Sequence, residues 1–439
     1  MQRELYKQLI GWKNSHNRKP LLLQGARQVG KTYLVNAFGK TEYSEYIYLN
    51  FEQDTNLHTL FIGNLDPHTI VNNLSLYLGK KINAKDTLLF FDEIQALPPA
   101  LTSLKYFCEQ WPEFHIIAAG SLLGVSVGKE VSFPVGKVNF MTLYPMQFRE
   151  YLMAFGEDLL VEKLSEIQTI EALPEIVHEK LLKHLKTYLY LGGMPEVLQS
   201  YLSEKDITLA RNIQKDILKA YQQDFSKYTD KTQAIRTSEL WNSVPYQLAK
   251  ENKKFKYSDI RKNARSMMFE QTIEWIKKAG LVNIAYDIRS SKIPLAAYAD
   301  YSKFKIYMLD TGLLGAMLNL TPDIIIKPTE LFNEYNGAFI ENFVASELLL
   351  SENNELYYWT SNSDAEVDFV LQVGNEIFPL EVKSGTSLNL KSLRSYADKY
   401  KPKLIFRTSP RNFSKNNEFI NIPLYAIFLL RKLIQSCCP

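Results

Sequence analysis

The sequence predicts a mixed α/β chain in three parts: a parallel sheet flanked by helices, a helical middle region, and a smaller α/β domain at the C-terminus. Near the N-terminus, continuous apolar runs such as 21–24 and 88–91 alternate with stretches of helical periodicity, which is typical of a doubly wound parallel sheet. Residues 151–230 alternate apolar and charged positions at helical spacing and contain few strand signals. Residues 365–373 then alternate at the period of a strand and lead through a turn into another apolar run.

Size and composition are those of a globular protein with more than one domain. The chain has 439 residues, of which 46% are hydrophobic and 23% charged, and this length exceeds one ordinary core. The net charge of +3 argues neither for nor against a nucleic-acid partner, although cations gather at 250–262 and 289–292. The three cysteines lack metal-ligand spacing, which fits a reducing compartment. Because the N-terminus lacks a signal-peptide pattern and no run approaches about 18 apolar residues, we expect a cytoplasmic protein without a membrane partner.

The first apolar run is followed by a complete phosphate-binding motif. Residues Gly25, Gly30, Lys31 and Thr32 fill the pattern G-x-x-x-x-G-K-[ST], and helical periodicity begins after Lys31. The glycines let backbone N–H groups face phosphate oxygens at the start of a helix. Lys31 is expected to reach the β- and γ-phosphates, and the Thr32 hydroxyl to ligate Mg²⁺. The predicted ATP-binding residues of this loop are Gly25, Ala26, Arg27, Gln28, Val29, Gly30, Lys31 and Thr32.

Polar residues also follow two further predicted strands. Asp92 and Glu93 come directly after the apolar run 88–91, at the carboxyl edge where open α/β sheets bind ligands. Asp92 is placed to hold magnesium through water, and Glu93 to orient the attacking water. Ser121 follows the predicted strand 114–120, where a small polar residue can sense the γ-phosphate. The sequence therefore predicts a site for ATP and Mg²⁺.

Several stretches of the chain carry a family resemblance. GARQVGKT, FFDEIQALP, AAGSLLG and LYPMQFREYL together resemble a family of prokaryotic AAA+-type ATPases that are usually paired with a C-terminal domain of unknown function. The resemblance continues in YLYLGGMPEVL, KFKIYMLDTGLL and YNGAFIENFVASEL, and so covers almost the whole chain. Such proteins often show Gly-Arg where this one has Gly136 and Lys137. Since lysine lacks the bidentate fork of arginine, Lys137 is a poor candidate for an arginine finger.

The middle of the chain contains a helix break and a pattern that resembles a winged helix. Residues 192–195, GGMP, lack the lysine and the preceding strand of a second phosphate loop, so they are interpreted as a break between helices. Residues 256–288 are predicted to form, in succession, a short helix, a turn, a longer helix and a strand, an order that resembles a winged helix. In such a fold Arg261, Lys262 and Arg265 could contact phosphates. The alternative is a packing or subunit-contact module with solvated cations, because glutamates share the longer helix with them.

The last part of the chain places three carboxylates and a lysine in an order that resembles the PD-(D/E)XK nuclease core. A predicted helix carries Glu341, and a later strand places Glu366 and Asp368 on one face. A turn then leads to a strand that carries Glu381, and Lys383 follows on the same face.

Metal-dependent cleavage would account for this spacing. Asp368 and Glu381 on paired strands can ligate one Mg²⁺, and Glu341 can complete its shell. Lys383 can position or deprotonate the attacking water. Without a metal, converging carboxylates repel one another and at least one titrates abnormally high. Two alternatives stay open: a fold retained as a structural or DNA-holding scaffold, and a plain salt bridge between Glu381 and Lys383 on a sheet edge.

The expected domains are a P-loop AAA+-type ATPase (1–155), a helical region (156–235), a winged-helix-like domain (236–325) and a nuclease-like domain (326–439). The leading hypothesis is a protein that binds and hydrolyses ATP and acts on nucleic acid, DNA rather than RNA, with ATP governing access to the nuclease-like domain. The alternative is a nucleotide-dependent switch or scaffold whose C-terminal domain binds a partner protein and cuts nothing. A homo-oligomer is a further open possibility.

Overall fold

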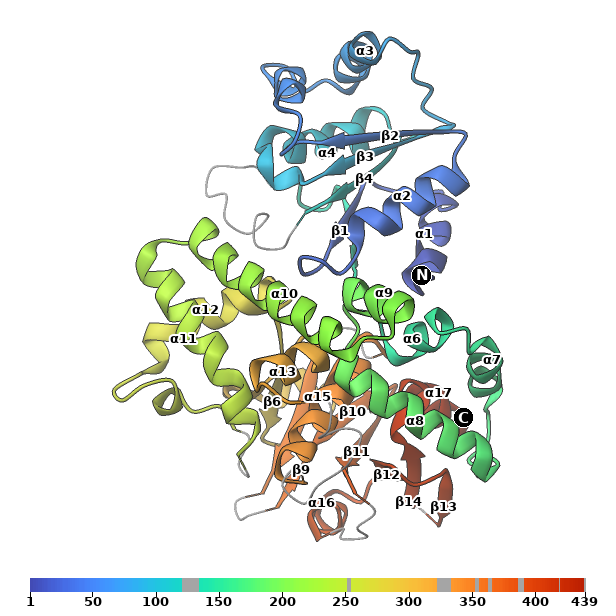
Figure 1. The fold of residues 1–439 in the computed structure, drawn as a ribbon, viewed down its shortest axis with the longest axis vertical. Coiled ribbons are helices and arrows are strands. Elements are labelled where there is room, and N and C mark those ends of the chain that lie inside the picture. The colour runs from blue at the N-terminus through green and yellow to red at the C-terminus, as the bar shows by residue number, and fades with distance from the viewer. Residues whose placement is uncertain are drawn as a thin grey trace. The chain divides into compact units, whose positions relative to one another are not determined.

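A computed structural model of the chain describes residues 1–120, 134–250, 254–321, 333–351, 355–361, 365–385, 391–417 and 419–437 (Figure 1). It divides into two compact units. The N-terminal unit comprises Met1–Tyr144 with the short pieces Ser226–Thr229 and Lys278–Gly280, and the C-terminal unit comprises the remainder. No helix within the described ranges is long and apolar enough to cross a membrane.

The N-terminal unit is built on a five-stranded parallel sheet, as the sequence predicts. Its strands follow the order β2-β3-β4-β1-β5, and each neighbouring pair is parallel. They are β1 (Leu21–Gln24), β2 (Glu45–Asn50), β3 (Thr87–Asp92), β4 (His115–Ala119) and β5 (Asn139–Thr142). The connecting helices are α1 (Leu5–Lys13), α2 (Lys31–Glu42), α3 (Pro67–Leu78) and α4 (Pro98–Gln110), with short 3-10 turns at Thr55–Phe61 and Ile94–Ala96.

The continuous apolar runs of this unit are buried strands covered on both faces. Every residue of β3 is buried, which explains why its sequence shows no alternation. On one face, the rings of Phe51, Phe61 and Phe91 meet edge to face with centroids 5.4–5.9 Å apart. This packing fixes β3, and with it the position of the residues at the end of β3.

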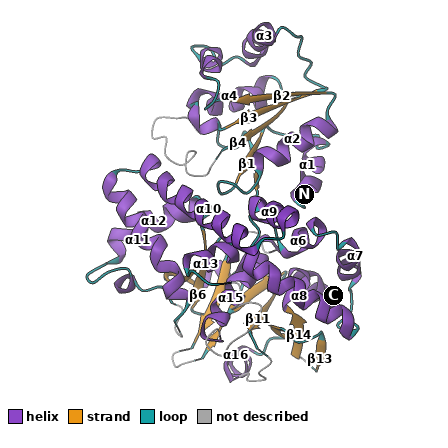
Figure 2. Ribbon diagram, in the orientation of Figure 1, coloured by secondary structure: helices purple, strands orange, loops and turns teal. Residues whose placement is uncertain are grey.

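The C-terminal unit begins with a succession of helices, which Figure 2 distinguishes from the strands that follow. These helices are α6 (Phe148–Ala154), α7 (Asp158–Glu166), α8 (Glu175–Leu191), α9 (Pro195–Glu204), α10 (Ile207–Tyr228) and α11 (Lys231–Leu248). A 3-10 turn (Tyr257–Asp259) and α12 (Ser266–Lys278) come next. Helix α8 ends before Gly192, whose φ of 72° suits glycine, so the predicted break at 192–195 is confirmed.

Two sheets complete this unit. The first has the order β7-β6-β8-β9 and the second β10-β11-β12-β14-β13. The strands are β6 (Val282–Ile288), β7 (Ala299–Met308), β8 (Leu356–Thr360), β9 (Glu366–Val367), β10 (Phe369–Val373), β11 (Glu376–Val382), β12 (Ile405–Ser409), β13 (Ser414–Asn416) and β14 (Phe419–Pro423). The remaining elements are α13 (Thr311–Met317), α15 (Asn333–Ser351), α16 (Lys391–Tyr400), α17 (Leu430–Cys437) and the 3-10 turns Leu295–Tyr298 and Leu424–Leu429.

The first sheet draws strands from two of the predicted domains. β6 pairs antiparallel with β7 and in parallel with β8. The chain then passes from β9, in the first sheet, to β10, in the second, through the single residue Asp368. A boundary near residue 325 therefore separates segments that share backbone hydrogen bonds, while the four domain ranges themselves stay a prediction.

A buried carboxylate joins two of the glycine-containing motifs. Asp310 accepts hydrogen bonds from the backbone N–H of Gly193 (2.6 Å) and of Leu313 (2.9 Å). A Cβ on Gly192 would lie 2.2 Å from the Asp310 carboxylate, so only glycine allows this approach. Burial raises the pKa of Asp310 to about 6, although these backbone hydrogen bonds oppose the rise. The motifs GGMP and LDTG are thus explained by packing within the C-terminal unit.

A second buried carboxylate, Glu347 on α15, provides a test of this packing. Its Oε1 accepts a hydrogen bond from the Phe148 N–H (2.9 Å), and burial raises its pKa from 4.5 to about 8. The unfolded chain releases this proton near pH 4.5 and the folded chain only near pH 8, so the stability contributed by Glu347 at low pH is lost across that window. Relative to wild type, the free energy of unfolding of Glu347→Gln should therefore increase as the pH rises through this window, by about 1.4 kcal/mol per pH unit.

Urea unfolding of both proteins across this pH range measures the difference. Glu196→Gln, which changes an exposed carboxylate on α9, is the matched control and should follow wild type. If the curves of Glu347→Gln and wild type run parallel over the whole range, the buried carboxyl does not titrate as described.

Candidate functional sites

The predicted phosphate loop connects β1 to α2 and has the backbone that its glycines predict. Gly25, Gln28 and Gly30 have φ values of 145°, 64° and 94°. A Cβ on Gly25 would lie 2.2 Å from the carbonyl oxygen of Leu143, so glycine is required where the loop passes the end of β5. The loop is thereby held in a curled form from which α2 begins at Lys31.

Lys31 closes the loop on itself. Its ammonium donates hydrogen bonds to the carbonyl oxygens of Gly25 and Ala26, both at 2.9 Å. Burial lowers the pKa of Lys31 to about 8, while Glu93 and Asp92 act in the opposite direction. The ammonium is thus a desolvated cation next to two carboxylates, at the place where phosphates are expected.

The two residues predicted to hold magnesium next to the phosphates lie in contact. Thr32 Oγ1 donates a hydrogen bond to Asp92 Oδ2 at 2.9 Å. The Tyr48 hydroxyl donates to the same oxygen at 3.0 Å. Tyr48 was not predicted as a site residue, because only the pairing of β2 with β3, which sets Tyr48 beside Phe90, brings it there.

Glu93 follows Asp92 in a left-handed conformation, with a φ of 50°. Its backbone N–H donates to Asp92 Oδ1 at 3.1 Å, and its carboxylate accepts a hydrogen bond from the Gln95 side chain. A Cβ on Gly120, directly after β4, would lie 2.4 Å from Gln95 Oε1, so the ends of β3 and β4 converge here. The predicted sensor Ser121 lies outside the described residues.

Arg3 also contacts the phosphate loop. Its buried guanidinium donates to the carbonyl oxygens of Val29 (2.8 Å) and Tyr144 (2.5 Å). Sequence spacing gives no signal for this contact, because the partners are 26 and 141 residues away. Lys137, the residue at the place of a possible arginine finger, forms an ion pair with Glu109 at 2.9 Å.

In the C-terminal unit, Glu381 lies on β11, whereas Asp368 is the single residue between β9 and β10. The antiparallel register of β10 with β11 ends at the pair Phe369 and Leu380, so each carboxylate follows or precedes a paired residue directly. Asp368 Oδ2 accepts a hydrogen bond from the backbone N–H of Val382 at 2.8 Å. The two residues that the sequence assigns to one metal are therefore neighbours across the strand pair.

Glu381 is buried and only partly satisfied. Its Oε1 lies 2.5 Å from the Lys383 ammonium, whereas its Oε2 is buried and makes no hydrogen bond within the described part of the chain. Burial raises the pKa of Glu381 and the Lys383 ammonium opposes this rise. Burial lowers the pKa of Lys383, but Glu381 outweighs it, so the Lys383 pKa is raised. The predicted pair is thus an ion pair between Glu381 on β11 and Lys383 just after β11, and the second oxygen of the Glu381 carboxylate takes no part in it.

Glu341, on α15, is engaged by two residues that sequence reasoning missed. Its Oε1 accepts hydrogen bonds from the Tyr307 hydroxyl (2.6 Å) and the Lys305 ammonium (3.0 Å). The same ammonium lies 2.5 Å from Glu366 Oε1. Burial lowers the pKa of Lys305, but Glu341, Tyr307, Glu366 and Asp368 together raise it well above its usual value, so the ammonium stays charged. Alternation along β7 was the available signal, but it does not say which sheet face is buried.

We call Glu341, Glu366, Asp368 and Glu381 the carboxylate cluster. A divalent cation fits the carboxylate cluster at one point. Carboxylate oxygens are the ligands that Mg²⁺ prefers, and Glu381 Oε2 is a buried oxygen without a hydrogen bond in the structure as described. Glu341, Asp368 and Glu381 do not form a group of three with ligand atoms all within 4.8 Å of one another. Among described residues, the group of three His, Cys, Asp or Glu side chains that meets this condition is Glu175, His178 and Glu179, on α8.

The cations of the predicted winged helix lie around the start of α12. Arg261, Lys262 and Arg265 are all exposed. Arg261 forms an ion pair with Glu239 at 3.1 Å, and its guanidinium lies 5.8 Å from the centroid of the Phe269 ring. Two of the three side chains therefore have no ion pair assigned within the described residues, while the third is already paired.

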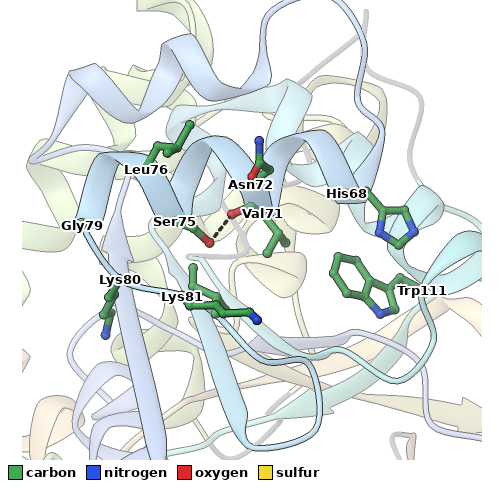
Figure 3. A pocket seen from close by; sticks show the side chains of 10 residues that line it. His68, Val71, Asn72, Ser75, Leu76, Gly79, Lys80, Lys81 and Trp111 are labelled. Atoms are coloured by element: carbon green, nitrogen blue, oxygen red, sulfur yellow. Dashed lines mark hydrogen bonds between the residues drawn. The ribbon is translucent and has the colours of Figure 1, made fainter.

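The N-terminal unit also has an open pocket of about 510 Å³ beside α3 (Figure 3). The rings of His68 and Trp111 stack at one end, with centroids 4.1 Å apart. Lys80, which also lines it, forms an ion pair with Glu45 at 2.9 Å. None of the residues predicted here for nucleotide or metal binding lines this pocket.

Comparison with known proteins divides the chain into three matched regions. Residues 17–152 match the AAA domain family. Residues 182–324 match one domain of unknown function, and residues 336–427 match another.

Similarity to whole proteins is more limited. An uncharacterized protein of Mycobacterium bovis and one of Mycobacterium tuberculosis are each 33% identical over 93 residues, which is 21% of this chain and 20% of theirs. Among solved structures, the Walker-type ATPase of Pyrococcus abyssi aligns with a TM-score of 0.45 and 14% identity, over 72% of this chain and 95% of that one. The Aeropyrum pernix ORC1 protein in complex with DNA has a TM-score of 0.26 and 12% identity, with coverages of 72% and 91%. AMPPCP-bound DnaA of Aquifex aeolicus has a TM-score of 0.22 and 15% identity, with coverages of 63% and 86%.

The loop at 25–32 and the parallel sheet agree with the match over residues 17–152. This region is an AAA-type P-loop ATPase domain, and the chain carries a domain of unknown function toward its C-terminus.

Proposed function

We propose that the chain binds and hydrolyses ATP with Mg²⁺ and acts on nucleic acid, DNA rather than RNA. The observation that carries the ATPase part is the hydrogen bond of 2.9 Å between Thr32 and Asp92, next to a loop closed by Lys31. A hydroxyl and a carboxylate in contact beside a phosphate loop are the two groups that hold Mg²⁺ in P-loop ATPases.

Nucleotide binding would use groups that are already in position. The N–H groups of residues 25–32 would surround the phosphates, and the Lys31 ammonium would exchange two loop carbonyls for phosphate oxygens. Thr32 and Asp92 would hold the metal, directly and through water. Glu93 would orient the attacking water once its bond to Gln95 opens.

The action on nucleic acid would be carried by the C-terminal unit. Asp368 and Glu381 would ligate Mg²⁺, which supplies a Lewis acid for phosphodiester cleavage, and Lys383 would hold the attacking water. The buried oxygen Glu381 Oε2 supports this role, because a carboxylate oxygen without a hydrogen bond is costly unless a cation satisfies it. Exposed Lys262 and Arg265, in a winged-helix-like segment, are suited to backbone phosphates of DNA.

A second function is favoured by a separate observation. Lys383 is closed onto Glu381 at 2.5 Å, and Lys305 is inserted between Glu341 and Glu366. Carboxylates that are neutralised by internal lysines form a stable core without a metal. The second candidate is therefore a nucleotide-dependent switch or scaffold whose C-terminal unit binds a partner protein, or a second copy of the chain, and cleaves nothing.

Lys31→Ala should weaken ATP binding by at least about tenfold, because one charge-assisted hydrogen bond contributes roughly 1.5–3 kcal/mol. Titration with a fluorescent ATP analogue measures the affinity. Lys40→Ala removes the same charge from the exposed end of α2 and should bind like wild type. Equal affinities for the Lys31 variant and the control would remove the phosphate loop from the nucleotide site.

Glu93→Gln should retain ATP but lose at least about 10²-fold in turnover, since the amide keeps the shape and cannot accept a proton. Phosphate release under saturating ATP and Mg²⁺ measures turnover, and the fluorescent analogue verifies binding. Glu113→Gln, an exposed change in the same unit, should release phosphate at the wild-type rate. Unchanged release by the Glu93 variant would transfer the catalytic role to another residue.

Glu381→Ala should abolish cleavage of supercoiled or branched DNA in Mg²⁺ or Mn²⁺ without reducing ATP hydrolysis, because the two sites lie on separate sheets. Cleavage is followed on gels with and without ATP. Glu376→Ala, on the same strand but paired with Lys403 at 2.6 Å, is the control and should cut as wild type does. If wild type cuts none of these substrates under any condition, the switch or scaffold function takes precedence.

A further inference from the structure

Lys305 is a charged side chain with no exposed surface, and it lies at the centre of the carboxylate cluster. It stands on β7 with a side-chain exposure of 0%, 3.0 Å from Glu341 and 2.5 Å from Glu366. Burying an ammonium is unfavourable unless carboxylates pair with it, and here two do. The cluster thus has a permanent cation supplied by the chain itself.

This cation comes from a different part of the chain than the carboxylates. Lys305 falls in the region 182–324, whereas Glu341 and Glu366 fall in the region 336–427. β6 pairs in parallel with β8 and antiparallel with β7, and these pairings hold the two regions in one sheet. The cluster is therefore assembled from both domains of unknown function.

The position of Lys305 disfavours a metal ion bound to Glu341. Glu341 Oε1 already accepts hydrogen bonds from both the Lys305 ammonium and the Tyr307 hydroxyl. A divalent cation bound to Glu341 would stand next to the ammonium in a buried place, where like charges repel strongly. Glu381 Oε2, in contrast, makes no hydrogen bond among the described residues and has its own lysine on the opposite oxygen.

We propose that Lys305 is a resident cation that competes with divalent metal for Glu341, so that metal binding is confined to the side of the cluster formed by Asp368 and Glu381. One part of this proposal rests on the proposed function: the location of the metal in wild type, at Asp368 and Glu381. The competition itself predicts a gain of metal binding when Lys305 loses its charge. A supporting role for Lys305 in holding metal ligands would predict the opposite sign.

Lys305→Met keeps an unbranched side chain, one atom shorter, and removes its charge. We expect the full-length variant to bind Mn²⁺ at least about tenfold more tightly than wild type, since a charge within 4–6 Å changes an ionisation by roughly 1–3 pKa units. Free Mn²⁺ is measured by electron paramagnetic resonance. Lys303→Met, which removes the same charge two residues earlier on β7 at an exposed position, should match wild type.

A second variant tests the proposal without disturbing Lys305. Glu341→Gln should leave the Mn²⁺ affinity of wild type nearly unchanged, whereas Glu381→Gln should abolish it. Equal losses in both variants would overturn the proposal, because Glu341 would then be a ligand.

The outcomes separate this proposal from the nuclease function. If wild type binds no Mn²⁺ but Lys305→Met does, the competition stands and the metal-dependent nuclease fails. If the Met variant binds no more tightly than wild type, the proposal is overturned, whatever cleavage is observed. Should the variant unfold, millimolar Mn²⁺ is expected to restore its circular-dichroism melting transition, and a failure to restore it also overturns the proposal.

Discussion

The proposed nucleotide site depends on one constraint: the carboxyl ends of parallel strands meet at one edge of the sheet. β1 and β3 are not neighbours, because β4 lies between them, yet Thr32 and Asp92 touch at 2.9 Å. The contact requires that the loop after β1 curls back and that β3 ends at Asp92. Glycine at position 25 permits the first, and the aromatic packing around Phe91 secures the second. The chemistry of the site is therefore a consequence of backbone geometry and core packing.

The C-terminal unit is governed by the cost of buried charge. Asp310, Glu347, Glu341 and Lys305 are all nearly or fully buried, and each is met by backbone N–H groups or by an opposite charge. Where the pairing is incomplete, as for Glu347, burial raises the pKa far enough for the group to take up a proton near neutral pH. Where it is complete, as for Lys305, the charge persists. Buried polar groups therefore specify how the helices and the two sheets fit together.

Residues that act through local geometry could be predicted from the sequence, and residues that act through distant contacts could not. The loop 25–32, the acidic end of β3 and the break at 192–195 depend on neighbours within a few positions. Tyr48, Arg3 and Lys305 reach their partners only through strand pairing or across 26 residues or more of sequence. The single-residue crossing at Asp368 was also invisible, because alternation from 366 to 373 indicates one strand where the structure has two. Sequence periodicity reports burial along a segment but not the identity of what covers it.

The composite origin of the carboxylate cluster limits how its activity can be studied. A fragment that begins near residue 326 would retain Glu341, Asp368, Glu381 and Lys383, and would be expected to show any nuclease chemistry. It would lack β6 and β7, however, so β8 would lose its parallel partner and Glu341 would lose both Lys305 and Tyr307. Glu341, Glu366, Asp368 and Glu381 would then share one internal lysine, Lys383. Their repulsion would either unfold the fragment or draw metal to Glu341, from which Lys305 is proposed to exclude it in the whole chain. Cleavage by such a fragment would therefore be no evidence for cleavage by the protein, and the intact chain is the species whose metal binding decides the question.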